Sequence, residues 1–233
     1  MKKNLILISV LILFTALDVS AQHRHRRSHH HSNSEFRLGV TTGLGFSNMK
    51  MDDDEDFSAK AGFKIGVIAE YAFNEHFALS SGLVFNQRGF KEIFSGTFMG
   101  FEEQSTTKIN LNYIQLPVNA VVRLPINNSL NIVGFAGPYF SYALSGKVTW
   151  EGTLTSGGIT TTEDGERKLD IGFGEDDLNP FDIGLTIGAG LEVSSFFFRV
   201  QYEHGLRNLS NDNRYTTMNR NLGLSIGYFF SFR

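Results

Sequence analysis

From residue 36 onward, apolar and polar side chains alternate along the chain with a period of two. In the segment 36–46 nearly every second residue is apolar, beginning with Phe36 and Leu38, and the residues between them are mainly glycine. Because successive side chains of a β-strand point to opposite faces, this alternation predicts a strand with one apolar and one polar face. The same pattern recurs in five further segments: 61–73, 77–88, 181–193, 198–203 and 221–232.

Two other segments alternate less regularly. In 108–124 the apolar residues from position 114 onward share one face, whereas Ile109, Leu111 and Tyr113 fall on the other. We therefore expect a β-bulge or a protruding rim there. The segment 130–144 has apolar residues at both odd and even positions, so its pattern does not show which residues face inward and which face outward. With these two segments the sequence predicts eight strands.

The connections between the predicted strands alternate in length. Three are short and four are longer: 74–76, 125–129 and 194–195, against 49–58, 94–107, 145–180 and 208–219. This alternation is typical of an up-and-down meander, and in outer-membrane barrels the short turns face the periplasm. We therefore expect three short periplasmic turns, four longer extracellular loops and both termini in the periplasm. β-prone stretches within 145–180 indicate that the strands flanking this loop extend beyond the membrane as a hairpin.

The composition of the polar face indicates which face points outward. A soluble barrel shows water a surface that is roughly 25–35% charged, whereas the polar face here is mainly glycine, serine, threonine and asparagine. Aromatic residues lie near the ends of the apolar face, as the interfacial girdles of membrane barrels require. We therefore predict an all-β fold, an eight-stranded antiparallel up-and-down transmembrane β-barrel over residues 36–233.

In such a barrel the polar face lines the lumen, and it carries charges of both signs. The predicted interior charge network consists of Arg37, Lys64, Glu70, Arg88, Arg123, Asp182, Glu192, Arg199, Glu203 and Arg207. Eight strands enclose a lumen that side chains can fill. Paired charges there predict a plugged barrel without a wide aqueous channel.

The N-terminus has the pattern of an export signal. Two lysines precede an apolar run from Leu5 to Leu17, and the residues up to Ala21 fit the small-residue rule of signal peptidase. The run is shorter than the roughly 20 residues that a membrane-spanning helix needs. We interpret residues 1–21 as a cleaved signal peptide and residues 22–35 as a periplasmic tether.

The 233-residue chain has no cysteine, which excludes disulfides, thiolate metal sites and a lipid anchor on an N-terminal cysteine.

The tether contains histidines close together in sequence: His23, His25, His29, His30 and His31. Neutral imidazoles at such spacing can share a divalent metal ion. The alternative is a solvated basic tether that meets acidic polymers or lipid head groups electrostatically, since an unfolded strip offers ligands without fixed geometry. Apart from divalent cations here or at the acidic loops, we expect no cofactor.

The long loops carry many more carboxylates than basic residues. The candidate cation ligands are Asp52, Asp53, Asp54, Glu55 and Asp56 in the first loop and Glu175, Asp176 and Asp177 in the third. Hard cations such as calcium take carboxylate oxygens, but the sixth position from Asp52 is Phe57 instead of glycine, which excludes an EF-hand. The alternative is a repulsive, soluble loop surface.

Four stretches of the chain resemble a known family. They are YIQLPV at 113–118, GFAGPY at 134–139, DIGLTIGAGLE at 182–192 and the last strand, which ends near Phe232. They are similar to the PorT-like, "porin family" outer-membrane β-barrel proteins, and the resemblance covers the region after the tether. It implies an eight-stranded barrel of the Gram-negative envelope. Members of the family mostly lack an assigned activity, and the namesake serves protein secretion and gliding machinery.

The end of the chain carries the predicted barrel-assembly signal. Its alternating aromatic residues are Tyr228, Phe230 and Phe232, and the chain ends one residue later, in Arg233 instead of an aromatic residue. The expected partners are therefore outer-membrane lipid and the barrel-assembly machinery. We expect a monomer and no nucleic-acid partner, because the chain has no phosphate loop or nucleic-acid motif.

For function, the sequence favours a structural or surface-interaction role through the acidic extracellular loops. One alternative is an accessory component of a secretion or envelope machine, which would engage partner proteins through the tether. A second alternative is a lipid-modifying barrel enzyme. The base and nucleophile considered for it are His204 and Ser210, which lie in no recognisable motif, so we do not predict an enzyme.

Overall fold

The computed structural model describes residues 34–50, 58–98, 101–174, 177–209 and 218–230. The strands in these ranges are β1 (Glu35–Lys50), β2 (Ser58–Ala72), β3 (Phe77–Phe98), β4 (Phe101–Pro125), β5 (Leu130–Ser156), β6 (Ile159–Leu169), β7 (Phe181–Val193), β8 (Phe196–Gly205) and β9 (Met218–Phe230). None of the described residues forms a helix with the length and hydropathy that a membrane crossing needs.

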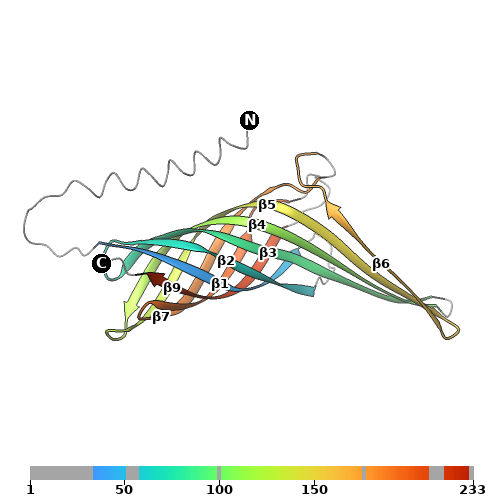
Figure 1. Ribbon diagram of the computed structural model, residues 1–233, viewed down its shortest axis with the longest axis horizontal. Coiled ribbons are helices and arrows are strands. Elements are labelled where there is room, and N and C mark those ends of the chain that lie inside the picture. The colour runs from blue at the N-terminus through green and yellow to red at the C-terminus, as the bar shows by residue number, and fades with distance from the viewer. Residues whose placement is uncertain (1–33, 51–57, 99–100, 175–176, 210–217, 231–233) are drawn as a thin grey trace, which may run out of the picture. The chain divides into compact units, whose positions relative to one another are not determined.

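Eight of the nine strands close into a ring in the order β1-β2-β3-β4-β5-β7-β8-β9 (Figure 1). Neighbours in the ring are antiparallel, and β9 pairs with β1 from Leu38↔Phe230 onward. The predicted eight-stranded up-and-down barrel is confirmed. Its apolar face points outward, where Val67 remains 55% exposed, while Glu70 on the other face of the same strand is fully buried.

The ninth strand, β6, lies where the sequence indicated a loop. Beyond the ring, β5 pairs with β6 on one side and with β4 on the other, and β4 also pairs with the far half of β3. The sheet β3-β4-β5-β6 therefore projects past the ring (Figure 1). The expected hairpin is present, but its second strand is β6 and not the strand at 181–193. The predicted loops 94–107 and 145–180 are largely strand, and they lack apolar alternation because neither face of this sheet is buried in a core.

The irregularity expected near Tyr113 is a β-bulge, but it lies in β5 and not in β4. The register between these strands shifts at Asn112/Tyr113, which leaves Leu144 of β5 without a partner in β4. In β4 itself the same parity faces inward throughout, so Leu111 and Tyr113 point into the lumen and are fully buried. Beyond the bulge, the opposite parity of β5 faces inward.

The structure also assigns the faces of 130–144, which the sequence left open. Phe135 and Tyr139 of β5 point into the lumen and are 5% and 0% exposed. Glycines of β7 make room for these rings. A Cβ atom on Gly188 would lie 2.3 Å from the Phe135 ring, and one on Gly184 would lie 2.5 Å from the Tyr139 ring. The small residues on the polar face thus admit large aromatic rings as well as charges.

Short turns connect the strands at one end of the ring. In the β2–β3 turn, Asn74 Oδ1 accepts hydrogen bonds from the backbone N–H groups of His76 and Phe77, both at 2.8 Å. Asn127 accepts two backbone hydrogen bonds in the same way in the β4–β5 turn, both at 2.9 Å. Such side-chain acceptors close a tight turn without a glycine. We call this end, where β1 begins and β9 ends, the turn end, and the opposite end the loop end.

Candidate functional site

Toward the turn end, two carboxylates and three arginines from five strands form an ion-pair cluster in the lumen. Glu70 of β2 and Glu192 of β7 are 0% and 1% exposed. Glu192 lies 2.9 Å from Arg123 Nε, 3.3 Å from Arg37 and 3.4 Å from Arg199, and Glu70 pairs with the same three arginines. Buried charges persist when they are paired in this way. We call these five residues the turn-end cluster.

A second cluster, nearer the loop end, is built around one arginine. Arg88 of β3 lies 2.8 Å from Asp182 of β7 and 2.7 Å from Glu203 of β8, and all three side chains are buried. Gln115 of β4 accepts a 2.6 Å hydrogen bond from Arg88 and donates one of 2.9 Å to Glu203. Tyr139 and two asparagines of β9 donate further hydrogen bonds to the carboxylates. We call this the loop-end cluster.

A cavity of about 50 Å³ is lined by members of both clusters, among them Arg199 and Glu203. Lys64 also lines it. The Lys64 side chain is 4% exposed and makes no hydrogen bond or ion pair with any residue that the structure describes. One water molecule takes about 30 Å³ of liquid. The cavity therefore has room for one or two water molecules and not for a passing solute.

Apolar side chains close the lumen between the loop-end cluster and the projecting sheet. Phe90, Leu111, Tyr113, Ala143 and Leu209 pack together there, each 5% exposed or less. We call this group the apolar cap. Leu111 and Tyr113 are apolar at positions that face the lumen, which indicates such a cap, but the same pattern is equally typical of a bulge.

One face of the projecting sheet is continuous with the lumen and carries exposed apolar side chains. The strand register places Phe94, Trp150, Leu154 and Ile159 on it, and they are 55%, 40%, 44% and 73% exposed. The Trp150 ring covers Gly165 of β6, where a Cβ atom would lie 2.2 Å from the ring. Glu103, Glu163 and Arg167 lie on the same face. Because of its exposed aromatic and aliphatic side chains, we call it the apolar face of the sheet.

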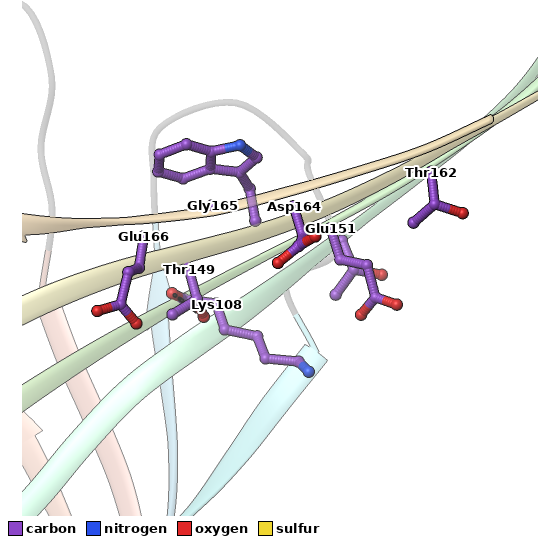
Figure 2. Close-up of a pocket in the computed structure, with 9 residues that line it drawn as sticks. Lys108, Thr149, Glu151, Thr162, Asp164, Gly165 and Glu166 are labelled. Carbon is purple, nitrogen blue, oxygen red and sulfur yellow. Dashed lines mark hydrogen bonds between the residues drawn. The ribbon is translucent and has the colours of Figure 1, made fainter.

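The other face continues the outer surface of the barrel and is mainly polar, although it also carries Ile93, which is 54% exposed. Figure 2 shows Lys108, Thr149 and Glu166 side by side on it, in agreement with the register of β4, β5 and β6. Glu151 and Asp164 stand opposite each other in the next row of this face. These residues line a shallow groove in which one lysine lies among three carboxylates.

The structure brings together nine of the ten residues predicted as an interior charge network. Five form the turn-end cluster, three belong to the loop-end cluster, and Lys64 lies beside the cavity between them. Arg207 follows the end of β8 and belongs to neither cluster. The sequence does not identify the polar partners Gln115, Asn219 and Asn221. The alternation pattern marks every inward polar residue alike, whether its side chain hydrogen-bonds to a charged group or only fills space.

Most of the other predicted site residues lie outside the described ranges. This holds for the histidines of the tether, for Phe232 and for seven of the acidic loop residues: Asp52, Asp53, Asp54, Glu55, Asp56, Glu175 and Asp176. Asp177 is described, and its Oδ2 accepts a 2.9 Å hydrogen bond from the Gly174 backbone N–H. Tyr228 and Phe230 lie at the turn end of β9 with ring centroids 5.4 Å apart. In the described ranges no three His, Asp or Glu side chains are grouped to hold a metal ion.

A closed ring of antiparallel strands with an apolar outer face and a polar, filled lumen defines a transmembrane β-barrel. The family model for the outer membrane protein beta-barrel domain matches residues 20–211. The chain therefore belongs to this family and is a protein of the bacterial outer membrane. No curated protein matches the chain.

Several solved structures are similar to the chain in fold. The attachment invasion locus protein Ail of Yersinia pestis is 18% identical, over 84% of this chain and 99% of that chain, with a TM-score of 0.37. Neisserial surface protein A is 12% identical, over 83% of this chain and 97% of that chain, with a TM-score of 0.39. The N-terminal β-barrel domain of Pseudomonas aeruginosa OprF is 13% identical, over 83% and 97%, with a TM-score of 0.28.

Proposed function

We propose that this protein is a closed-lumen outer-membrane barrel with a structural or surface-interaction role, which it performs as a monomer through its loop end. In the proposed orientation the turn end and both termini lie in the periplasm. The projecting sheet and the acidic loops then lie outside the cell. The lengths of the connections support this orientation, since barrels of this class keep their short turns in the periplasm.

The observation that carries the proposal is the projecting sheet. Its strands β4 and β5 are 25 and 27 residues long, whereas about 9–11 residues suffice to cross a bilayer. The excess length builds a sheet beyond the membrane, and the apolar face of that sheet leaves Phe94, Trp150 and Leu154 between 40% and 55% exposed. Apolar side chains gathered on an exposed face mark sites of interaction with other molecules.

The filled lumen supports a role other than transport. The apolar cap and the two ion-pair clusters occupy it, and the cavity between the clusters measures about 50 Å³.

The proposal also assigns no catalytic residue. His204 lies at the end of β8 opposite Arg220, with its ring 6.3 Å from that of Tyr202. Its suggested partner Ser210 is outside the described residues.

The proposal is tested by the attachment of cells that carry variants of the sheet. The test variant removes apolar side chains from the apolar face: F94S, W150S, L154S and I159S. The matched control changes as many residues on the opposite face: I93S, T106S, T153S and T162S. We expect cells with the wild type to attach to surfaces and to neighbouring cells, cells with the test variant to lose this attachment, and cells with the control to keep it.

Both variants should retain the folded barrel in the outer membrane, which the heat-dependent mobility on gels verifies. The mass of lipid A should be the same in all strains. Equal attachment by the wild type and the test variant would contradict the proposal. A changed lipid A mass in a deletion strain would favour the lipid-modifying enzyme instead.

The secretion or envelope machine stays an alternative proposal. It rests on the sequence resemblance to PorT-like proteins and on the basic tether 22–35. Envelope proteins that copurify with the full chain, and are lost when the tether is removed, would support it. We also propose that divalent cations bind at the tether histidines or at the acidic loops. Metal analysis of the purified protein tests this proposal.

A further inference from the structure

Five lysines lie together on the outer surface at the loop end, and we call them the lysine band: Lys60 of β2, Lys91 of β3, Lys108 of β4, Lys147 of β5 and Lys168 of β6. The register sets Lys91 directly opposite Lys108, and Lys147 directly opposite Lys168. Asn110 lies between Lys60 and Lys147, because it stands opposite Lys147 and accepts a hydrogen bond from Lys60. The band therefore runs across five neighbouring strands.

A row of hydrogen-bonded polar side chains separates the lysine band from the apolar outer surface. Gln87 donates a 3.3 Å hydrogen bond to Asn112, and Asn112 donates one of 2.9 Å to Ser145. On the turn-end side of this row the outward side chains are apolar, such as Leu83 and Leu116, which are 45% and 43% exposed. On its other side the lysines begin. The band thus lies at the depth where lipid head groups meet the barrel.

Glu166 lies on the same face as the band, and Glu151 and Asp164 lie in the next row, but only one of the five lysines forms an ion pair. Lys147 pairs with Glu166, and the other four lysines form no ion pair with any residue in the described part of the chain. Like charges directly opposite each other destabilise a sheet. An anion between these lysines would relieve their repulsion.

The placement of lysines also distinguishes the two ends of the barrel. Among the described residues, Lys64 lies in the lumen and every other lysine lies at the loop end. At the turn end the outward side chains at the matching depth are apolar, such as Phe73, Phe77 and Leu124, which are 50%, 54% and 53% exposed. A positive rim at one end suits a membrane in which one leaflet presents more negative head groups to the barrel.

We propose that the lysine band binds the phosphate groups of phosphorylated glycolipids in the outer leaflet. Lysine ammonium groups bind phosphate as point charges. The contacts hold the base of the projecting sheet against the lipid surface and leave its apolar face free. The proposal rests on the proposed orientation, with the loop end outside the cell. It needs no divalent ion, which distinguishes it from cation bridging by the acidic loops.

The experiment measures how much glycolipid stays bound to the full mature chain. The refolded barrel is placed in phosphatidylcholine nanodiscs that contain bisphosphorylated lipid A, or lipid A from which the phosphates have been removed, with a chelator throughout. Native mass spectrometry after release from the nanodisc then counts the retained lipid. The test variant neutralises four lysines of the band: K91Q, K108Q, K147Q and K168Q.

We expect the wild type to retain bisphosphorylated lipid A in preference to the dephosphorylated form. Each lysine lost should lower the affinity about fivefold, as expected for one basic residue at an anionic lipid surface. Two controls are matched to the test variant. Lysine-to-arginine changes at the same four positions keep the charge and should keep the lipid, and Arg167→Gln removes a charge from the opposite face of the sheet and should have no effect.

Equal lipid retention by the wild type and the glutamine variant would overturn the proposal, and so would equal retention of the two forms of lipid A. Heparin serves as a competing polyanion. If heparin binding depends on the band but lipid A retention does not, the band recognises a sulfated polymer and the lipid proposal is wrong. Nanodiscs present both leaflets alike, so the result does not depend on orientation, and the attachment assay tests the proposed function separately.

Discussion

Arg88 and Asp182 are 94 residues apart in the chain, yet they face each other across the lumen with both side chains fully buried and Nη1 of Arg88 2.8 Å from Oδ2 of Asp182. Their strands, β3 and β7, are not neighbours in the ring. The pair therefore ties opposite walls of the barrel together. Glu203 of β8 adds a third wall to the same guanidinium group.

Removal of this guanidinium should destabilise the barrel strongly. Arg88→Met leaves Asp182 and Glu203 buried without their cation, and breaking a buried pair in this way costs about 3–5 kcal/mol. We expect the free energy of unfolding to fall by that amount when urea unfolding is followed in detergent micelles. Arg167→Met, at an exposed position of the projecting sheet, is the control and should leave the midpoint unchanged. A small loss for Arg88→Met would mean that water reaches the loop-end cluster.

The glycines that face aromatic rings should not tolerate a side chain. A Cβ atom at Gly188 would lie 2.3 Å from the Phe135 ring and 2.6 Å from a backbone oxygen of β8. We expect Gly188→Ala to cost about 1–3 kcal/mol through overpacking. Gly134 of β5 is the matched control, because its added Cβ would meet nothing within 4 Å. Gly134→Ala should change stability by less than about 0.5 kcal/mol. Equal effects of the two substitutions would contradict the assigned packing.

The filled lumen predicts that the protein does not conduct. In planar lipid bilayers we expect a current indistinguishable from that of the empty membrane, since the ion-pair clusters and the apolar cap fill the lumen and leave only a cavity of about 50 Å³ between the clusters. A wide porin in the same bilayer serves as the positive control. Reproducible current steps of constant size would show that the clusters or the cap open.

The barrel should keep its form in cold detergent and lose it on boiling. We expect the protein in the outer-membrane fraction, with a faster-migrating band before boiling than after it. The physical reason is that a closed ring of backbone hydrogen bonds has no free edge within the ring from which detergent can unravel it. Recovery in the soluble periplasm without a mobility shift would be incompatible with the membrane barrel.

The parts of the fold that the sequence predicted are those in which membrane and lumen impose opposite chemistries on alternate residues. For this reason charged residues such as Glu70 and Arg199 are easily recognised in the sequence among the small residues of the polar face. β6 gave no such signal, because both faces of the projecting sheet are accessible to water. The turn before β6 does have a local sequence signal, because a Gly-Gly pair is typical of a two-residue hairpin turn. In the structure Gly157 and Gly158 form this turn with φ values of 58° and 84°.

The grouping of charges into two clusters could not be predicted, because it depends on the stagger of the strands. Parity places Arg88 and Arg123 in the lumen alike, but only the register decides that Arg88 meets Asp182 while Arg123 meets Glu192. The lysine band illustrates the same limit. Lys91 and Lys108 are opposite each other only in the observed pairing of β3 with β4.

The turn-end cluster has a consequence for biogenesis. Its charges come from β1, β2, β4, β7 and β8, and Arg37 and Arg123 of the first half pair with Glu192 of the second, so the cluster is complete only when both halves of the chain meet. A partly assembled barrel would hold bare guanidinium and carboxylate groups, which require hydration. The interior of the nascent barrel must therefore stay hydrated until β9 pairs with β1 and closes the ring. Drying of the lumen then accompanies the final closure and commits the barrel to the membrane.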